Sequence, residues 1–121
     1  MKSLNRNVKE VSFSICGQKW IIRVVDSHDP HMVADGAVCR GCTWVGQSAI
    51  YMSNELTDLT FKRVLIHELV HACLFATQMS VPDAFNEEQL CDFFAIYSEK
   101  ILDLANKIEQ GFFTDEDNSS I

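Results

Sequence analysis

Alternation of apolar and polar residues marks the first strands of this chain. Residues 11–15 alternate strictly, and residues 20–25 are rich in β-branched side chains. Both patterns are typical of β-strands. Residues 16–19 lie between them, contain a glycine and read as a turn, so we expect a β-hairpin. The first nine residues are expected to be poorly ordered, unless residues 4–10 hold a short helix.

A third apolar segment, residues 49–53, has the pattern of a short strand. It follows residues 26–41, where Asp-Pro, Asp-Gly and Arg-Gly pairs are turn signals. We therefore expect a long loop and then a third strand, which leads into a helix. This strand is also our candidate for a sheet edge that pairs with an extended substrate.

Helical spacing replaces alternation in the second half of the chain. Apolar residues recur every three or four positions from about Thr57 to about Gln78, which predicts a helix with one buried face. Thr57 or Asp58 can cap its N-terminus, because either side chain can accept a hydrogen bond from the first turn.

A second helical pattern starts after Asn86, with Gln89 placed for a capping box. It ends near Gly111, which we assign to the position just after the helix. Residues 114–121 read as a disordered acidic tail. The order of elements predicts an α+β fold: a small three-stranded sheet, antiparallel or mixed, packed on two helices. We expect one domain over residues 1–113.

Composition narrows the class of protein. The chain has 121 residues, 47% of them hydrophobic, and a formal net charge of −7. An acidic chain without a dense basic patch is not expected to bind nucleic acid. No apolar run approaches the roughly 20 residues of a membrane span, and no export signal is visible. The five cysteines therefore predict reduced thiols in a cytoplasmic protein.

The strongest chemical signal is His67-Glu68-Leu69-Val70-His71 inside the first helix. Two histidines four residues apart lie about 40° apart around a helix, so both imidazoles can reach one metal ion. Glu68 flanks that position and can accept a proton from zinc-activated water. The alternative is a pair of core histidines that are satisfied by hydrogen bonds.

A catalytic zinc site of this kind needs a third protein ligand. No third histidine follows, so we expect a carboxylate from the second helix. Glu88 is the preferred candidate, since Asp92 lies one turn later on the same face and could orient a ligating imidazole. Glu87 competes with it for the same role.

Other residues offer weaker chemical signals. His28, His31, Cys39 and Cys42 could together hold a second, structural zinc ion, although their spacing is tighter than in most zinc fingers. A peptidase also needs a group that stabilises the oxyanion. The candidates are Tyr51, Tyr97, His28 and His31.

These motifs resemble those of the gluzincin metallopeptidases. His67-Glu68-x-x-His71, followed by Glu88-x-x-x-Asp92-x-x-Ala95, is similar to the pattern of that clan. Within it, the strand Ile50-Tyr51-Met52 and the run from Leu65 to Ala72 look most like the compact ImmA/IrrE-type and small phage-encoded peptidases. The resemblance covers about half of the chain. It implies a minimal zincin-like fold and Zn²⁺ held by His67, His71 and Glu88.

The sequence thus predicts a zinc metallopeptidase that acts on a peptide or protein substrate, with Glu68 as general base. The alternative is a zinc-binding, catalytically silent regulatory or partner-binding module on a peptidase scaffold. Nothing in the sequence defines the substrate.

Overall fold

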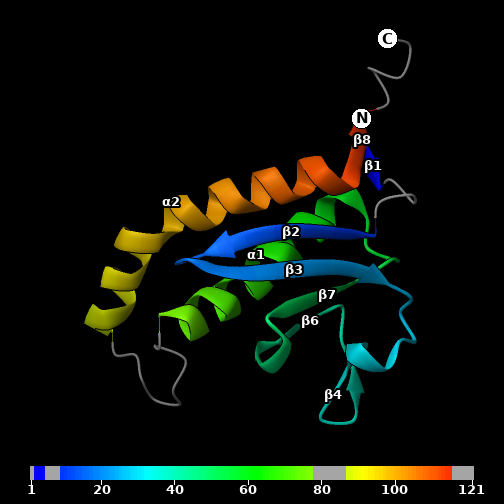
Figure 1. Cartoon of the computed structure of the whole chain (residues 1–121), viewed down its shortest axis with the longest axis horizontal. Coiled ribbons are helices and arrows are strands. Elements are labelled where there is room, and N and C mark those ends of the chain that lie inside the picture. Colours follow the sequence, from blue (N-terminus) through cyan, green and yellow to red (C-terminus); the bar gives the residue numbers. More distant parts are fainter. Residues whose placement is uncertain (1, 5–8, 78–86, 116–121) are drawn as a thin grey trace.

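The chain is described by a computed structural model over residues 2–4, 9–77 and 87–115 (Figure 1). Two helices, α1 and α2, pack with a mixed β-sheet. The strands are β1 (Lys2–Leu4), β2 (Glu10–Ile15), β3 (Gln18–Val25), β4 (Val33–Ala34), β5 (Ala37–Val38), β6 (Gly41–Trp44), β7 (Ala49–Ser53) and β8 (Phe113–Asp115). The helices are α1 (Asp58–Ala76) and α2 (Glu87–Phe112), with short 3₁₀ turns at Pro30–Met32 and Val45–Gln47.

The main sheet has the strand order β2-β3-β7-β6. The expected hairpin is confirmed: β2 and β3 pair antiparallel, and Cys16 and Gly17 both take positive φ in the turn between them. β3 and β7 are parallel, whereas β7 and β6 are antiparallel. The sheet is therefore mixed. This is one of the two arrangements, antiparallel or mixed, that the sequence left open.

The fourth strand, β6, was not expected. The sequence pattern places its residues in the turn-rich loop and in the segment that leads to the third strand. β6 pairs with β7 from Gly41↔Met52 to Trp44↔Ala49 and occupies the end of the sheet. The assignment of residues 49–53 to a sheet edge was thus wrong, because β7 lies between β3 and β6 and all five of its residues are buried.

The core forms where α1 covers one face of the sheet. Alternate residues of β7, Ile50 and Met52, join α1 residues such as Leu65 and Leu69 in the main cluster. Tyr51, between them, points to the opposite face and packs with Met32 and Ala49 in a second, smaller cluster. The side of the sheet to which a residue belongs therefore decides whether it can reach α1.

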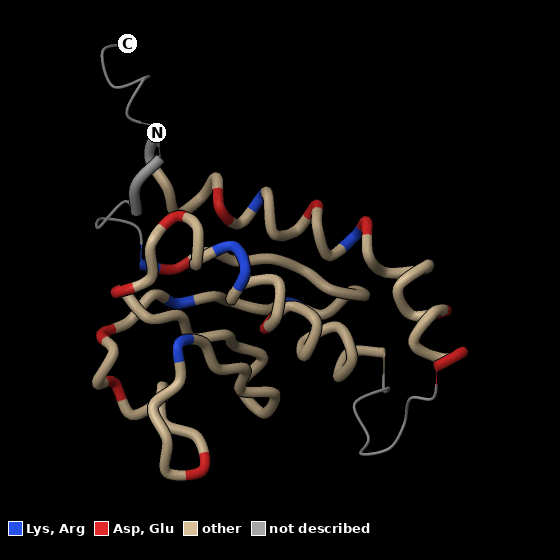
Figure 2. The backbone as a smooth tube through the Cα atoms, turned by 180° about the vertical axis from the view of Figure 1, so that it is seen from behind, with Lys and Arg blue, Asp and Glu red and all other residues tan. Residues whose placement is uncertain are grey.

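α2 runs antiparallel to α1 and along the β2 side of the sheet (Figure 1). The Nζ atom of Lys62 on α1 lies 2.8 Å from Oδ1 of Asn106 and 3.6 Å from Oε1 of Glu109 on α2. Figure 2 shows acidic and basic positions interleaved along α2. None of the described helices is both long and apolar enough to cross a membrane.

The ends of α2 differ from expectation. Gly111 lies inside the last turn, not after it, and a Cβ there would come within 2.9 Å of Cγ2 of Val11. Glycine is thus required for the close approach of α2 to β2. Residues 113–115 form β8, which pairs antiparallel with β1, so these residues do not belong to a disordered tail. The cap at Asn86 and residues 116–121 lie outside the described residues.

Candidate active site

α1 presents the His-Glu-x-x-His motif on a well-anchored helix. The N–H of Thr57 donates to Oγ1 of Thr60 at 2.9 Å, which satisfies one backbone group at the N-terminus of the helix, at the position predicted from the sequence. Phe61, Leu65, Leu69 and Ala72 are completely buried in the main core cluster, which the sheet and α2 share with α1. This buried face fixes the rotation of the helix and thereby decides which way the motif points.

The two histidines project from α1 into solvent. The side chain of His67 is 69% exposed, and His71 is also exposed. Their Nε2 atoms lie only 3.2 Å apart, and the ring centroids are 4.9 Å apart with planes at 72°. They are not satisfied core histidines, which removes the main non-metal explanation for the pair.

The distance between the two Nε2 atoms suits a shared metal ion. Four-coordinate zinc with Zn–N bonds of 2.0–2.1 Å separates two ligand nitrogens by roughly 3.3–3.4 Å. The observed 3.2 Å is close to this value. It also suits one hydrogen bond between two neutral rings, so the pair fits the metal without requiring it.

Glu68 lies beside the histidines but turns into the protein. Its side chain is 7% exposed, and Oε2 lies 3.9 Å from Nε2 of His67. Oε1 accepts a hydrogen bond of 2.8 Å from Oγ1 of Thr43 on β6. One carboxylate oxygen is therefore held by β6, while the other lies near the imidazole of His67.

β6 reaches Glu68 because Gly41 has no side chain. A Cβ on Gly41 would lie 2.6 Å from Cγ1 of Val64 and 3.0 Å from Cγ of Glu68. Sequence analysis did not identify Gly41 or Thr43 as residues of the site. The available signal was the Cys-Thr-Trp run after Gly41, since threonine and aromatic residues are frequent in strands.

The predicted third ligand, Glu88, lies in the first turn of α2 and is exposed, as are Glu87 and Asp92. Within residues 9–77 and 87–113, no group of three or more His, Cys, Asp or Glu side chains is arranged to hold a metal ion. The structure therefore brings together His67, His71 and Glu68 but does not bring Glu88 to them.

The antiparallel packing of the helices explains the position of Glu88. Because Lys62 contacts Asn106 and Glu109, His71 is level with about residues 97–100 of α2. Glu88 lies a further nine to twelve residues along α2, which is roughly 13–18 Å of helix. The first turns of α2 accordingly extend past the end of α1 (Figure 1).

The four residues of the suggested second zinc site also do not assemble into such a group. His28 is exposed, and Nδ1 of His31 contacts Oδ1 of Asp29 at 2.7 Å. Burial raises the pKa of the Cys42 thiol, and the nearby Cys39 and Glu68 raise it further.

Three of the four oxyanion candidates, namely Tyr51, His28 and His31, lie away from the motif. The ring of His31 stacks on Tyr51 with centroids 4.2 Å apart, on the sheet face opposite α1. His28 belongs to the same loop, where its N–H donates to Asp26. Tyr97 packs on Phe93 within α2, with ring centroids 5.1 Å apart.

Comparison with protein-family models, with curated proteins and with solved structures finds no match for the chain. The function is therefore inferred from the side chains of α1 and β6 themselves.

Proposed function

We propose that the chain is a zinc-dependent metallopeptidase in which Glu68 is the general base. The observation that carries the proposal is the 3.2 Å separation of the two solvent-facing Nε2 atoms, with a buried carboxylate beside them. A structural zinc site requires only ligands, whereas Glu68 is a further carboxylate placed next to them.

His67 and His71 would each hold the metal through Nε2. Zinc bound there would supply Lewis acidity, which lowers the pKa of a water molecule and polarises a peptide carbonyl. Glu68 accepts the proton of the attacking water and delivers it to the leaving amine. Thr43 keeps the carboxylate in place, since its hydroxyl donates to Oε1.

The free edge of β6 offers a place for an extended substrate. The N–H of Ser53 donates to the carbonyl of Arg40 at 3.0 Å, so the alternation of antiparallel pairs directs the backbone groups of Gly41 and Thr43 away from β7. A substrate strand that pairs with these groups would run beside Glu68. β6 thus takes over the role that we expected of residues 49–53.

A second candidate function is a silent zinc-binding module. It is favoured by the fact that no third ligand accompanies the two histidines among residues 9–77 and 87–113. Such a module would bind zinc, or a partner through zinc, without cleaving peptide bonds.

Glu68→Gln separates the two functions. We expect the variant to bind zinc like the wild type, because Glu68 is not a ligand, and to lose about 10²- to 10⁴-fold in peptide hydrolysis. Elemental analysis measures bound zinc. A library of unfolded peptides is used to measure cleavage. Glu55→Gln, an exposed glutamate before α1, is the matched control and should leave both unchanged.

A wild type that binds one zinc ion but cleaves no peptide would establish the silent module. If neither the wild type nor the Glu55→Gln variant binds zinc, both functions fail.

A further inference from the structure

The two histidines of α1 offer a pair of metal ligands on an open surface. Both side chains are exposed, and their Nε2 atoms lie 3.2 Å apart. Zinc is almost always four-coordinate when it is bound structurally. A zinc ion held by these two rings would therefore accept two more ligands, and the source of those ligands determines what the site can do.

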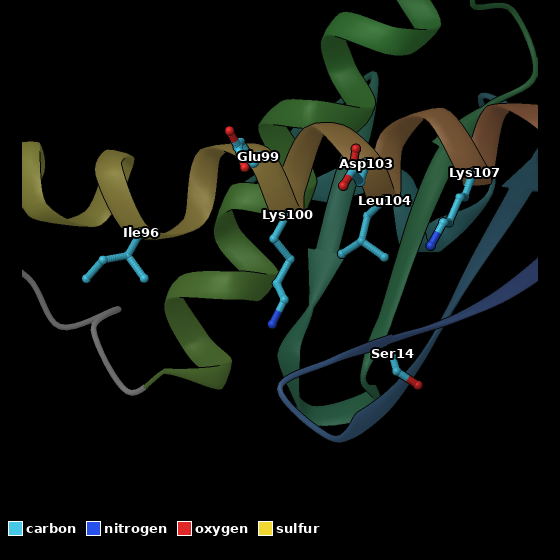
Figure 3. Close-up of a pocket in the computed structure, with 7 residues that line it drawn as sticks. All are labelled: Ser14, Ile96, Glu99, Lys100, Asp103, Leu104 and Lys107. Carbon is cyan, nitrogen blue, oxygen red and sulfur yellow. The ribbon is translucent and has the colours of Figure 1, made fainter.

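α2 does not supply these ligands in the part of the chain that the structure describes. Glu99 and Asp103 are the carboxylates of α2 that are level with His71 and His67, because Lys62 contacts Asn106 and Glu109. Both line a cavity of about 430 Å³ between α2 and β2 (Figure 3). Neither they nor any other described His, Cys, Asp or Glu side chain completes a group of three around a metal position.

Glu68 does not complete the set either. Its side chain is only 7% exposed, and Oε1 is held by the hydroxyl of Thr43. The two imidazoles, by contrast, project from the outer side of α1 into solvent. Further ligands can therefore approach the metal from outside the molecule.

The outer side of α1 around the histidines is largely apolar. Leu59, Val70 and Leu74 lie on the same side of the helix as His67. Leu59 is 90% exposed, and the other two are partly exposed. A protein surface can therefore pack beside the metal position without burying unpaired charges from these three positions.

The charged side chain on this side of α1 is Arg63, four residues before His67. When two copies of α1 meet antiparallel with His67 and His71 at the centre, their Arg63 residues lie at opposite ends of the contact. The separation is about 18 Å along the helices, which exceeds the screening length of roughly 8 Å at physiological salt. Repulsion between these arginines therefore does not oppose a pair of identical chains.

We propose that one zinc ion joins two copies of the chain, with His67 and His71 of each copy as its four ligands. The inference rests on the zinc ligands named in the proposed function, but not on peptide hydrolysis. A twofold axis through the metal makes the two copies equivalent, and twofold dimers are the commonest protein oligomers. Because catalytic zinc needs an open position, the dimer is a closed form of the site.

Sedimentation velocity with the full chain tests the proposal. We expect the metal-free wild type to be a monomer, and its mass to double when half an equivalent of zinc is added. A chelator should restore the monomer. Glu68→Gln should dimerise in the same way, because Glu68 is not a ligand, and so the readout does not depend on hydrolysis.

His71→Ala and, independently, His67→Ala each remove one ligand from every copy. Both variants should remain monomeric at the same zinc concentration. His28→Ala, at an exposed histidine outside the motif, is the matched control and should dimerise like the wild type. Circular dichroism confirms that all three variants fold.

The outcomes separate this inference from the proposed peptidase. A wild type that binds one zinc ion per chain and stays monomeric would overturn the dimer and leave the peptidase in place. A dimer that forms without zinc, or equally well in His67→Ala and His71→Ala, would also overturn it. Zinc-dependent dimers in a protein that cleaves no peptide would refute the peptidase alone, and absence of zinc binding would refute both.

Discussion

The hydroxyl of Thr43 decides how the Glu68 carboxylate is held. Thr43→Val keeps the shape of the side chain but leaves Oε1 of a buried carboxylate without its donor. We expect the free energy of unfolding to fall by about 1–3 kcal/mol. We also expect peptide hydrolysis to slow by about 10- to 100-fold, since the general base is no longer held in place. Urea unfolding and the rate of peptide hydrolysis measure the two effects.

Thr43→Ser is the matched control, because it restores the hydroxyl. It should recover both the stability and the hydrolysis rate of the wild type. A Thr43→Val variant with an unchanged hydrolysis rate would show that Thr43 does not position the base.

Measurements of zinc affinity can show whether Glu88 or its neighbour Glu87 is the third zinc ligand. If Glu88 is the third ligand, Glu88→Ala should weaken zinc binding by at least about 100-fold, more than the 10- to 100-fold typical of outer-shell partners. Glu87→Ala should bind zinc like the wild type. Titration with a competing zinc chelator measures both. The reverse pattern would assign the ligand to Glu87, and no change in either variant would remove α2 from the site.

At the level of elements, the contact between β6 and α1 depends on Gly41. Gly41→Ala places a Cβ 2.6 Å from Cγ1 of Val64, which is closer than packed side chains tolerate. We expect a loss of about 1–3 kcal/mol in unfolding free energy, as for other overpacked sites, together with reduced hydrolysis. Thermal unfolding and activity assays test this.

Gly46→Ala is the control for Gly41→Ala, because a Cβ at Gly46 meets nothing within 4 Å. It should be close to neutral. Truncation of Val64 to alanine in the Gly41→Ala background should recover part of the lost stability. If Gly41→Ala is as stable as Gly46→Ala, the close approach of the two elements is not required.

Prediction of the elements succeeded where the signal was local. The β2–β3 hairpin and α1 follow from alternation, helical spacing and turn or cap residues that lie within a few positions of one another. β6 could not be predicted from local signals, because its four residues are all partly buried and show no alternation. Its place in the sheet comes from pairing with β7.

For the whole molecule, burial of Cys73 couples stability to alkaline pH. Burial, with Cys16 nearby, raises the pKa of the Cys73 thiol from 9.0 to about 11. A raised pKa in the folded state means that the thiol contributes stability below pH 9, where it is protonated in both states. This contribution is lost as the pH rises from 9 to about 11, because the unfolded chain ionises first.

We therefore expect the urea midpoint of the wild type to fall between pH 9 and pH 11 more steeply than that of Cys73→Ala. Cys91→Ala, at an exposed position, is the control and should follow the wild type. Parallel slopes for all three proteins would show that Cys73 does not govern the alkaline limb.

The sequence by itself determined the hairpin, the His-Glu-x-x-His helix and the adjacency of His67 and His71, because each depends on spacing along one element. Only the tertiary structure decided what surrounds them. It placed Thr43 of β6 against Glu68, put Tyr51 and His31 on the opposite face of the sheet, and did not bring Glu88 to the two histidines. These relations depend on strand order and helix register, which arise from contacts between residues distant in the chain.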